Sequence, residues 1–517
     1  MASFPTPQQY IFNDFKGIRT RNGVVANGVI SATVCKNIDF VPSSYDASIN
    51  IATTKGNYTI CAYTDYTVIK GFETEQEGTK HLLLYVENDT KGKLVEYNFL
   101  SDDFTTLIDN LTLTGQANGI TLKHQAYDVF VFTNGIEYYA IQFYPTPTVT
   151  TQLHPEYDGN DLTGLAMCEY YGSVVIGGDN GVVLASSRTD ITDFDTTGGL
   201  DTSAWAETFG KAVTAVVPYI DSILVFTADD STVLSGYQTI ATREREDASL
   251  GGCYSFESWC NHDKYLFFYD DKQKNIYYYM QNNFGQKVLG EPIAPEVQKY
   301  FNNLQKLQMV SYIGKNRSEI WLLSDNFKLI YDYYVGEWTE RNCQELTSYF
   351  VFDNDVYSTS EAKVLKEKEG NICLFDNVYY PAEYTTQIIN LGSFSNAKEM
   401  DIYPLLSVTQ DYNNSFYFDC LVDGKKEKSK HVEMFFQGAI WADDTPQTEN
   451  TPDNELWDLQ TFPAENSSHI QQVKGKIIPF WYYIQFSFKT KERGEDFSIS
   501  CFEIKGITQE YDTIGRK

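Results

Sequence analysis

A pair of short apolar strands joined by a turn recurs between residues 81 and 365, and this repeat constrains the fold more than any other feature of the sequence. Each copy has a polar lead-in, an apolar strand, a turn and a second apolar strand. The copies begin at His81, Tyr127, Tyr171, Ile220, His262 and Arg317, with a degraded copy at Asn354. Successive starts lie 46, 44, 49, 42, 55 and 37 residues apart.

A single hairpin of this size cannot bury its apolar face alone, so neighbouring copies must pack against each other. A period of about 45 residues leaves room for four strands, which is the size of a β-propeller blade. Seven copies therefore predict a propeller of about seven blades, although the uneven spacing also fits six or eight. The alternative is a two-sheet sandwich with regular hairpins.

The apolar residues are of the kinds that strands prefer. The chain has 38 Tyr, 33 Phe and 7 Trp but only 6 Met, and aromatic and β-branched side chains favour strands. We therefore expect an all-β protein. A short helix at residues 202–207 is one expected exception.

A second exception lies between the fifth and sixth hairpins, at residues 291–307. Pro295 falls in what would be a first helical turn. Val297, Phe301 and Leu304 then fall on one face of a helix. The pattern predicts a surface helix inserted into the propeller, and it accounts for the 55-residue spacing.

The repeat ends near residue 383, and the strands beyond it are longer and more widely spaced. Alternating side chains, as in Phe416, Phe418 and Cys420, indicate half-buried antiparallel strands. We expect a C-terminal β-sandwich at residues 384–517. An acidic loop without periodicity, residues 441–457, interrupts it. The expected strands are residues 385–391, 401–408, 415–422, 431–437, 477–488 and 497–504.

The chain is strongly acidic, with 70 Asp and Glu against 40 Lys and Arg and a formal net charge of −30. Such a surface repels phosphate and an anionic membrane face, which excludes a protein that grips nucleic acid through basic patches. The longest apolar run, residues 477–486, is about half the length needed to span a bilayer, and no secretory signal is visible. Nine scattered Cys without a CxxC pair indicate reduced, structural thiols made in a cytosol.

No motif for catalysis or cofactor binding stands out. None of the six His lies within four residues of another, so HxH and HExxH metal sites are absent. The Gly-rich stretch Gly177-Gly-Asp-Asn-Gly181 links two strands, so we interpret it as a hairpin turn and not as a phosphate loop. Doublets such as Asp229-Asp230 direct adjacent carboxylates to opposite sides of a strand, so they do not form a glycosidase pair. We expect no catalytic residue, cofactor or metal.

Five segments of the chain, taken in order, resemble segments of one known family. Residues 12–40, FNDFKGIRTRNGVVANGVISATVCKNIDF, resemble its opening, which precedes a propeller. Residues 186–194, SSRTDITDF, are similar to its serine–arginine segment. Gly251-Gly-Cys253 is similar to its step into the next blade. Residues 293–296 resemble the start of its inserted helix. Residues 329–339, LIYDYYVGEWT, resemble its hydrophobic-Tyr-Asp-x-x-x-Gly-x-Trp hairpin. The family is the tail nozzle, tail tubular or packaged-DNA stabilisation hub protein of short-tailed bacteriophages.

The resemblance implies a non-enzymatic structural protein of the virion tail, made in the host cytoplasm. Copies would form a ring, six-fold in known relatives, attached to a portal or adaptor assembly and other tail proteins. Residues 1–45 would be a docking segment, 46–383 the propeller and 384–517 the sandwich. Double-stranded DNA would be retained and later ejected through an acidic lumen to which it does not stick, because carboxylates repel phosphate. The Tyr-, Asn- and Lys-rich composition suits a phage of an AT-rich host, such as a crAss-like one.

Two other functions stay open: a monomeric propeller that serves as a protein-binding scaffold, and a propeller that binds or degrades carbohydrate through convergent carboxylates. Oligomeric state separates the ring from the scaffold. In a ring, the two segments that depart from the repeat, residues 291–307 and 441–457, are the expected intersubunit contacts. Their candidate residues are Val297, Phe301, Leu304, Trp441, Asp443, Asp444 and Trp457.

Overall fold

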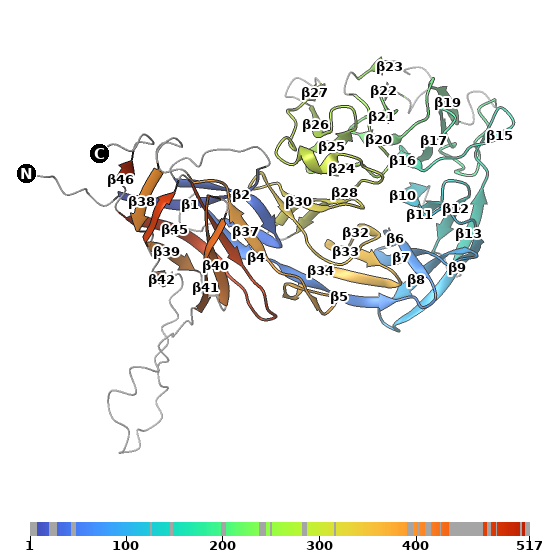
Figure 1. The fold of residues 1–517 in the computed structure, drawn as a ribbon. Coiled ribbons are helices and arrows are strands. Elements are labelled where there is room, and N and C mark those ends of the chain that lie inside the picture. Colours follow the sequence, from blue (N-terminus) through green and yellow to red (C-terminus); the bar gives the residue numbers. More distant parts are fainter. Residues whose placement is uncertain are drawn as a thin grey trace, which may run out of the picture. The chain divides into compact units, whose positions relative to one another are not determined.

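The described part of the chain forms two compact units in a computed structural model (Figure 1). The propeller unit contains residues 57–334 and 343–370, and the composite unit contains residues 1–56, 335–342 and 371–517. The described residues are 8–19, 28–42, 48–124, 127–144, 148–197, 203–236, 244–248, 251–281, 287–314, 317–389, 397–401, 403–408, 415–423, 425–433, 469–472, 477–481, 483–506 and 509–511.

The propeller unit consists of seven antiparallel blades that follow one another around an axis (Figure 1), and the strands of the sixth and seventh blades belong to larger sheets. The first blade is β6 (Thr67–Gln76), β7 (Thr79–Glu87), β8 (Gly92–Asn98) and β9 (Asp103–Leu111). The second is β10 (Asn118–His124), β11 (Tyr127–Thr133), β12 (Tyr138–Gln142) and β13 (Val149–Leu153). The third is β16 (Ala166–Tyr170), β17 (Ser173–Gly177), β18 (Val182–Ala185) and β19 (Trp205–Thr208). The fourth is β20 (Ala215–Tyr219), β21 (Ser222–Phe226), β22 (Ser231–Ser235) and β23 (Glu244–Asp247).

The remaining blades complete the circle. The fifth is β24 (Trp259–His262), β25 (Tyr265–Asp270), β26 (Asn275–Gln281) and β27 (Lys287–Leu289). The sixth contains β28 (Gln308–Gly314), β29 (Arg317–Leu323) and β30 (Lys328–Asp332), and the seventh contains β32 (Ser348–Phe352), β33 (Asp355–Ser360) and β34 (Lys363–Ile372). The strand β5 (Lys55–Ala62) lies outside β34, so a segment from before the first blade completes the last one. A small hairpin, β14 (Glu156–Tyr157) and β15 (Asn160–Asp161), precedes the third blade.

The predicted all-β propeller is confirmed, with seven blades. Each of the seven hairpins found in the sequence forms the second and third strands of a blade; the hairpin that begins at His81, for example, is β7 and β8. These strands are buried on both faces, because each sheet packs between two neighbours. Buried apolar clusters accordingly lie between successive blades: one joins Val131 of the second blade to Ile176 of the third, and another joins Val216 to Val183.

Polar side chains at the ends of the inner strands also link successive blades. The Tyr170 hydroxyl donates to the carbonyl oxygen of Asp221 at 2.9 Å, and the Tyr219 hydroxyl donates to that of Lys264 at 3.1 Å. His262 occupies the corresponding position in the fifth blade, completely buried between the Ser311 and Ser318 hydroxyls. Burial lowers the pKa of His262, because the charged imidazolium would lose its hydration.

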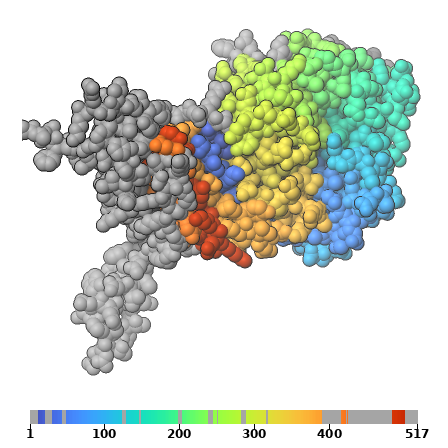
Figure 2. Space-filling view, in the orientation of Figure 1, coloured from blue at the N-terminus to red at the C-terminus, as the bar shows by residue number. Residues whose placement is uncertain are grey.

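The seventh blade contacts the first. Lys80 forms ion pairs with Asp353 at 2.9 Å and with Glu73 at 3.3 Å, and the rings of Phe99 and Phe352 stack with centroids 5.2 Å apart. In the space-filling view, blue atoms of the first blade adjoin orange atoms of the last (Figure 2). The seven blades therefore form a closed ring.

The composite unit interleaves strands from both ends of the chain. Strand β1 (Gln8–Ile18) pairs in parallel with β2 (Gly28–Lys36) and antiparallel with β45 (Ser498–Gly506), while β2 pairs with β37 (Glu383–Thr386). Its other strands are β3 (Ile38–Pro42), β4 (Ile49–Thr53), β31 (Glu337–Glu340), β35 (Leu374–Phe375), β36 (Val378–Tyr379), β38 (Ala397–Asp401), β39 (Tyr403–Val408), β40 (Ser415–Val422), β41 (Lys425–Glu433), β42 (His469–Gln472), β43 (Ile477–Trp481), β44 (Ile484–Lys489) and β46 (Gln509–Tyr511).

This division differs from the three consecutive domains expected from the sequence. The N-terminal strands do not stand apart from the C-terminal ones, since β1 and β4 both pair with β45. Residues 335–342, expected in the propeller, belong to the composite unit. The side-chain amide of Asn37 holds this segment, donating to the Asn342 carbonyl oxygen at 2.8 Å and accepting from its N–H at 2.9 Å.

Both predictions of a helix from the sequence are wrong over the described residues. Residues 291–307 contain only one turn of 3₁₀-helix, η3 (Gln298–Phe301). The chain becomes extended at Asn302, and Asn303 has a left-handed φ of 61°, which ends the turn. Residues 205–207 of the second predicted helix lie in strand β19, where tertiary pairing overrides local preference. Among the described residues, no helix is long and apolar enough to cross a membrane.

A candidate functional site at the propeller axis

Two of the three predicted contact residues at 291–307 are buried within the propeller unit. Val297 and Phe301 are completely buried in the propeller unit. The Phe301 ring lies between those of Tyr269 and Phe327, with centroids 5.0 and 5.6 Å away. These two side chains are therefore core residues, which corrects the prediction that they contact a neighbouring copy. Leu304 is half-buried and keeps some accessible surface.

The other predicted contact residues lie outside the described part of the chain. They are Trp441, Asp443, Asp444 and Trp457.

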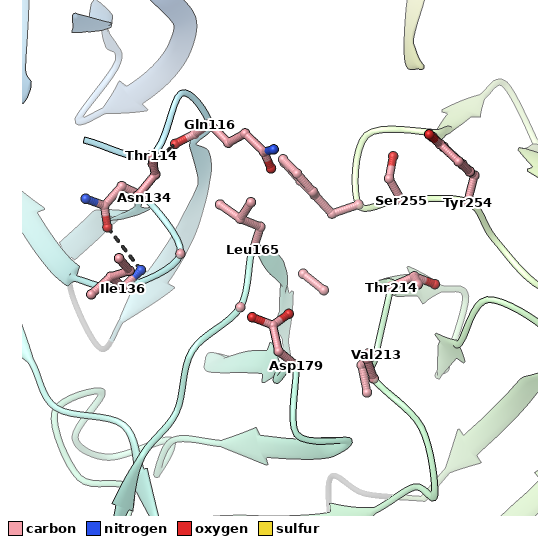
Figure 3. A pocket seen from close by; sticks show the side chains of 15 residues that line it. Thr114, Gln116, Asn134, Ile136, Leu165, Asp179, Val213, Thr214, Tyr254 and Ser255 are labelled. Atoms are coloured by element: carbon pink, nitrogen blue, oxygen red, sulfur yellow. Dashed lines mark hydrogen bonds between the residues drawn. The ribbon is translucent and has the colours of Figure 1, made fainter. Parts of the chain in front are cut away.

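A cavity of about 400 Å³ opens at one end of the propeller axis (Figure 3). Its walls are the loops that lead into the inner strands β10, β16, β20 and β24, together with the β11–β12 and β17–β18 turns. These six segments meet because the inner strands all begin at the same end of the ring, and the second and third strands of each blade turn there. This is a place where propellers can bind ligands or partners, because loops from several blades converge.

Local hydrogen bonds fix the cavity wall on the second blade. The Asn134 carboxamide oxygen accepts the N–H groups of Ile136 at 3.1 Å and Glu137 at 2.8 Å, while its nitrogen donates to the Thr112 carbonyl at 2.9 Å. This Asx turn holds Ile136 at the rim, where 52% of its surface is exposed. The Gly164 N–H donates to the Gly135 carbonyl at 2.9 Å, which ties the second blade to the third.

The cavity combines one charge with an apolar wall. Asp179, in the β17–β18 turn, is the only charged residue among those that line it; Leu165, Val213 and Phe256 supply apolar surface. The Asp179 N–H donates to the Thr163 carbonyl at 2.9 Å, which fixes the turn. In Figure 3 the Asp179 carboxylate and the Gln116 amide both point toward the space between the loops.

Next to this cavity, side chains from opposite parts of the ring meet. Lys70 of β6 forms an ion pair with Glu257, which precedes β24, at 2.5 Å, and the side chains are only 13% and 11% exposed. The Lys70 ammonium also lies 5.2 Å from the ring centroid of Phe256. From the sixth blade, Gln308 exchanges two hydrogen bonds with the backbone of Tyr349, at 2.9 and 2.7 Å. The interior of the propeller is therefore a packed core at this level and not an open channel.

The lining residues of the cavity are suited to binding a ligand. A single carboxylate lines the cavity, whereas glycoside hydrolysis uses two. Across the described residues, no group of three or more His, Cys, Asp or Glu side chains is placed to hold a metal ion. The eight described cysteines are buried and unpaired in disulfides, and burial raises the pKa of Cys253 to about 12. Such thiols are poor nucleophiles.

The sequence predicted the Asp179 turn but not the cavity. The Gly177–Gly181 stretch is the β17–β18 hairpin turn, as expected. The other lining residues lie in loops, where periodicity carries no information. The signal that could have located the site is recurrence: turns at equivalent points of successive hairpins must lie at the same end of a propeller.

Comparison with known proteins assigns no family. No family model matches the chain, and no curated protein matches it. Among solved structures, it is similar to BBS1N in complex with ARL6DN, in crystals soaked with lead (TM-score 0.38) or mercury (TM-score 0.36). Identity is 12% in both cases, over 62% of this chain and 98% of the other. It is also similar to the computationally designed Ika8 protein, with TM-score 0.35 and 12% identity over 61% of this chain and 99% of that one.

Proposed function

We propose that the protein is a structural, non-enzymatic subunit of a short-tailed bacteriophage tail. Copies would assemble into a ring-shaped nozzle or hub, joined to the portal or adaptor and to other tail proteins. The ring would retain packaged double-stranded DNA and provide an acidic conduit for its ejection. The basis is the resemblance to the tail nozzle family, considered together with where the resembling residues lie in the fold.

The observation that carries the proposal is a joint between two resembling segments far apart in the sequence. Glu337, from the residue 329–339 segment, accepts the Gly17 N–H at 3.0 Å and an Arg19 N–H at 2.8 Å, both from the residue 12–40 segment. Gly17 lies so close to the Trp338 backbone that a Cβ at this position would collide with it. Trp338 is 1% exposed. A joint this tight restricts which residues can occupy it, which is a physical reason for a family motif at both segments.

Two other resembling segments also occupy structural positions. In the residue 186–194 segment, the Ser187 N–H donates to the Asp193 carbonyl at 2.8 Å, and Phe194 is buried. At the step into the fifth blade, the Cys253 N–H donates to the Thr227 carbonyl at 3.1 Å, and Cys253 is fully buried. We expect a structural subunit of a virion to have motifs that stabilise its fold and not motifs for catalysis.

The filled propeller axis decides where a conduit could run. Because Lys70, Glu257 and the aromatic rings around them close the interior of the propeller, duplex DNA has no route through one copy. A conduit would have to lie between several copies around a shared axis. The net charge of −30 per chain favours a lumen that phosphate does not adhere to.

The proposal is tested by the assembly state of the full chain. Sedimentation velocity over a wide concentration range, combined with class averages from electron microscopy, should give a closed ring with an axial hole that admits duplex DNA. Antibodies raised against the chain should label one end of tailed particles from the source culture. A strict monomer that is also absent from purified particles would refute the proposal and favour the monomeric scaffold.

A gel-shift titration with duplex DNA at low salt tests the conduit separately. We expect no stable complex, because an acidic surface cannot release counterions from DNA. A tight, salt-sensitive complex would contradict a lumen through which DNA slides freely.

A further inference from the structure

The axial cavity holds one carboxylate and no cationic lining residue. Asp179 is exposed at the cavity mouth, and its side chain receives one long hydrogen bond, from the Thr163 hydroxyl at 3.4 Å. Of the fifteen residues that line the cavity, Asp179 alone carries a formal charge. A ligand that enters this space therefore meets a net negative charge.

Apolar side chains form part of the cavity wall. Leu165, Val213 and Phe256 line the wall, and Ile136 extends it to the rim with half of its surface exposed. Gln116 is exposed on the far side from Asp179, where its amide can accept or donate a hydrogen bond. One anionic group, an apolar wall and a polar opposite end together describe a complement to a linear organic cation.

We propose that this cavity binds an alkylammonium or alkylguanidinium group, with the cationic head on Asp179 and the methylene arm against Leu165 and Ile136. An anion would be repelled by Asp179. A bare divalent metal ion would find one carboxylate where such ions take six or more oxygen ligands. The volume of about 400 Å³ lies within the range of small-molecule sites, so the head and arm of such a cation can enter together.

The head group could come from a free small amine or from a Lys or Arg side chain of another protein. Both present the same chemistry to Asp179, so probes of each kind are needed. The free probes are agmatine and putrescine, and the side-chain probe is an acetylated, amidated Gly-Arg-Gly peptide. N-butylurea is the neutral control, because it has a similar arm without the charge.

Binding is measured on the full-length protein by methyl NMR with labelled Ile and Leu. The Ile136 and Leu165 signals are assigned from Ile136→Val and Leu165→Ile variants. We expect saturable shifts of both signals with the cations, with a dissociation constant on the order of 1 mM. Raising the salt concentration should weaken binding, because the attraction involves an exposed charge.

Asp179→Asn should weaken the binding of every cation about fivefold, the loss expected for one partly solvated charge pair. The matched control is Asp89→Asn, which removes an exposed carboxylate from the β7–β8 turn and should leave binding unchanged. Shifts with the free amines alone would identify a small-molecule site, and shifts with the peptide as well would identify a site open to a protein side chain.

The proposal is overturned if no cation shifts the two signals, if N-butylurea binds as tightly as agmatine, or if Asp179→Asn binds as wild type does. The salt dependence of binding to the wild-type protein tests the same charge contact even if the variant folds poorly. The site lies within one propeller and does not require a ring, so failure here and failure of the proposed function are distinguishable.

Discussion

The propeller should be sensitive to the loss of either partner of the ion pair between Lys70 and Glu257. The two side chains come from opposite parts of the ring, and both are nearly buried. Lys70→Met keeps most of the length of the side chain but leaves the Glu257 carboxylate without its cation. Removing one partner of a buried pair costs about 3 kcal/mol or more, since the remaining charge stays desolvated. Loss of the cation–π contact with Phe256 adds about 0.5–1 kcal/mol.

Differential scanning calorimetry of the full-length protein can measure this effect. A loss of about 3 kcal/mol should lower the midpoint of the transition that contains the propeller by roughly 5 °C. Lys91→Met is the matched control: Lys91 pairs with Asp109 at 2.9 Å, but its side chain is 32% exposed and that of Asp109 42%. That variant should melt close to the wild type.

A double-mutant cycle with Glu257→Gln isolates the pair. The combined variant should lose about 2 kcal/mol less than the sum of the single variants, because each single change already removes the same interaction. Two results would refute the reasoning: a Lys70→Met variant as stable as Lys91→Met, or a coupling energy near zero.

Three further predictions concern burial and close packing. Because burial lowers the pKa of His262 in the folded state, its contribution to stability should be complete above the unfolded pKa of about 6.5 and decline as the pH falls below it. The melting temperature of His262→Gln should therefore fall less at acid pH than that of the wild type. An identical pH dependence of the two melting temperatures would contradict this. Gly252→Ala should destabilise the propeller strongly, because a Cβ at residue 252 collides with the Ala228 carbonyl. In the control Gly210→Ala the added Cβ meets no atom, so this variant should melt at or slightly above the wild-type temperature. Equal melting midpoints of the two variants would show that the backbone adjusts. The eight buried thiols should resist a disulfide exchange reagent in the folded protein, so that at most one thiol, that of Cys501, reacts rapidly. Rapid labelling of Cys168 or Cys253 would show that the blades open.

The sequence predicted the propeller because its central strands carry the repeat on their own residues. Strand β21 is apolar after its first residue, and β7 has five successive buried apolar residues, 82–86, since neighbouring blades cover both faces. The closing strand β5 was not predictable in this way, because its partner β34 lies about 300 residues further along the chain and nothing local marks the pairing. The same holds for β1 and β45 in the composite unit.

The errors at residues 291–307 have a physical cause. Val297 and Phe301 do share one side of the chain, as the spacing predicted, but they face the propeller core from a single turn. Helical spacing of three residues, Val297, Phe301 and Leu304, does not distinguish a full helix from a single turn followed by extended chain. Val297 and Phe301 were therefore wrongly predicted as contact residues, while the cavity residues lay in loops for which spacing makes no prediction.

The central claim is a ring of copies whose lumen is lined by carboxylates. Electron cryomicroscopy of the assembled full-length chain tests it most directly, because one map gives closure, hole size and the residues that face the axis. We predict a closed ring with an axial hole that admits duplex DNA and with Asp and Glu side chains predominating on its wall. A monomer, or a ring whose acidic residues lie on the outer wall while the lumen is neutral or basic, would contradict the account.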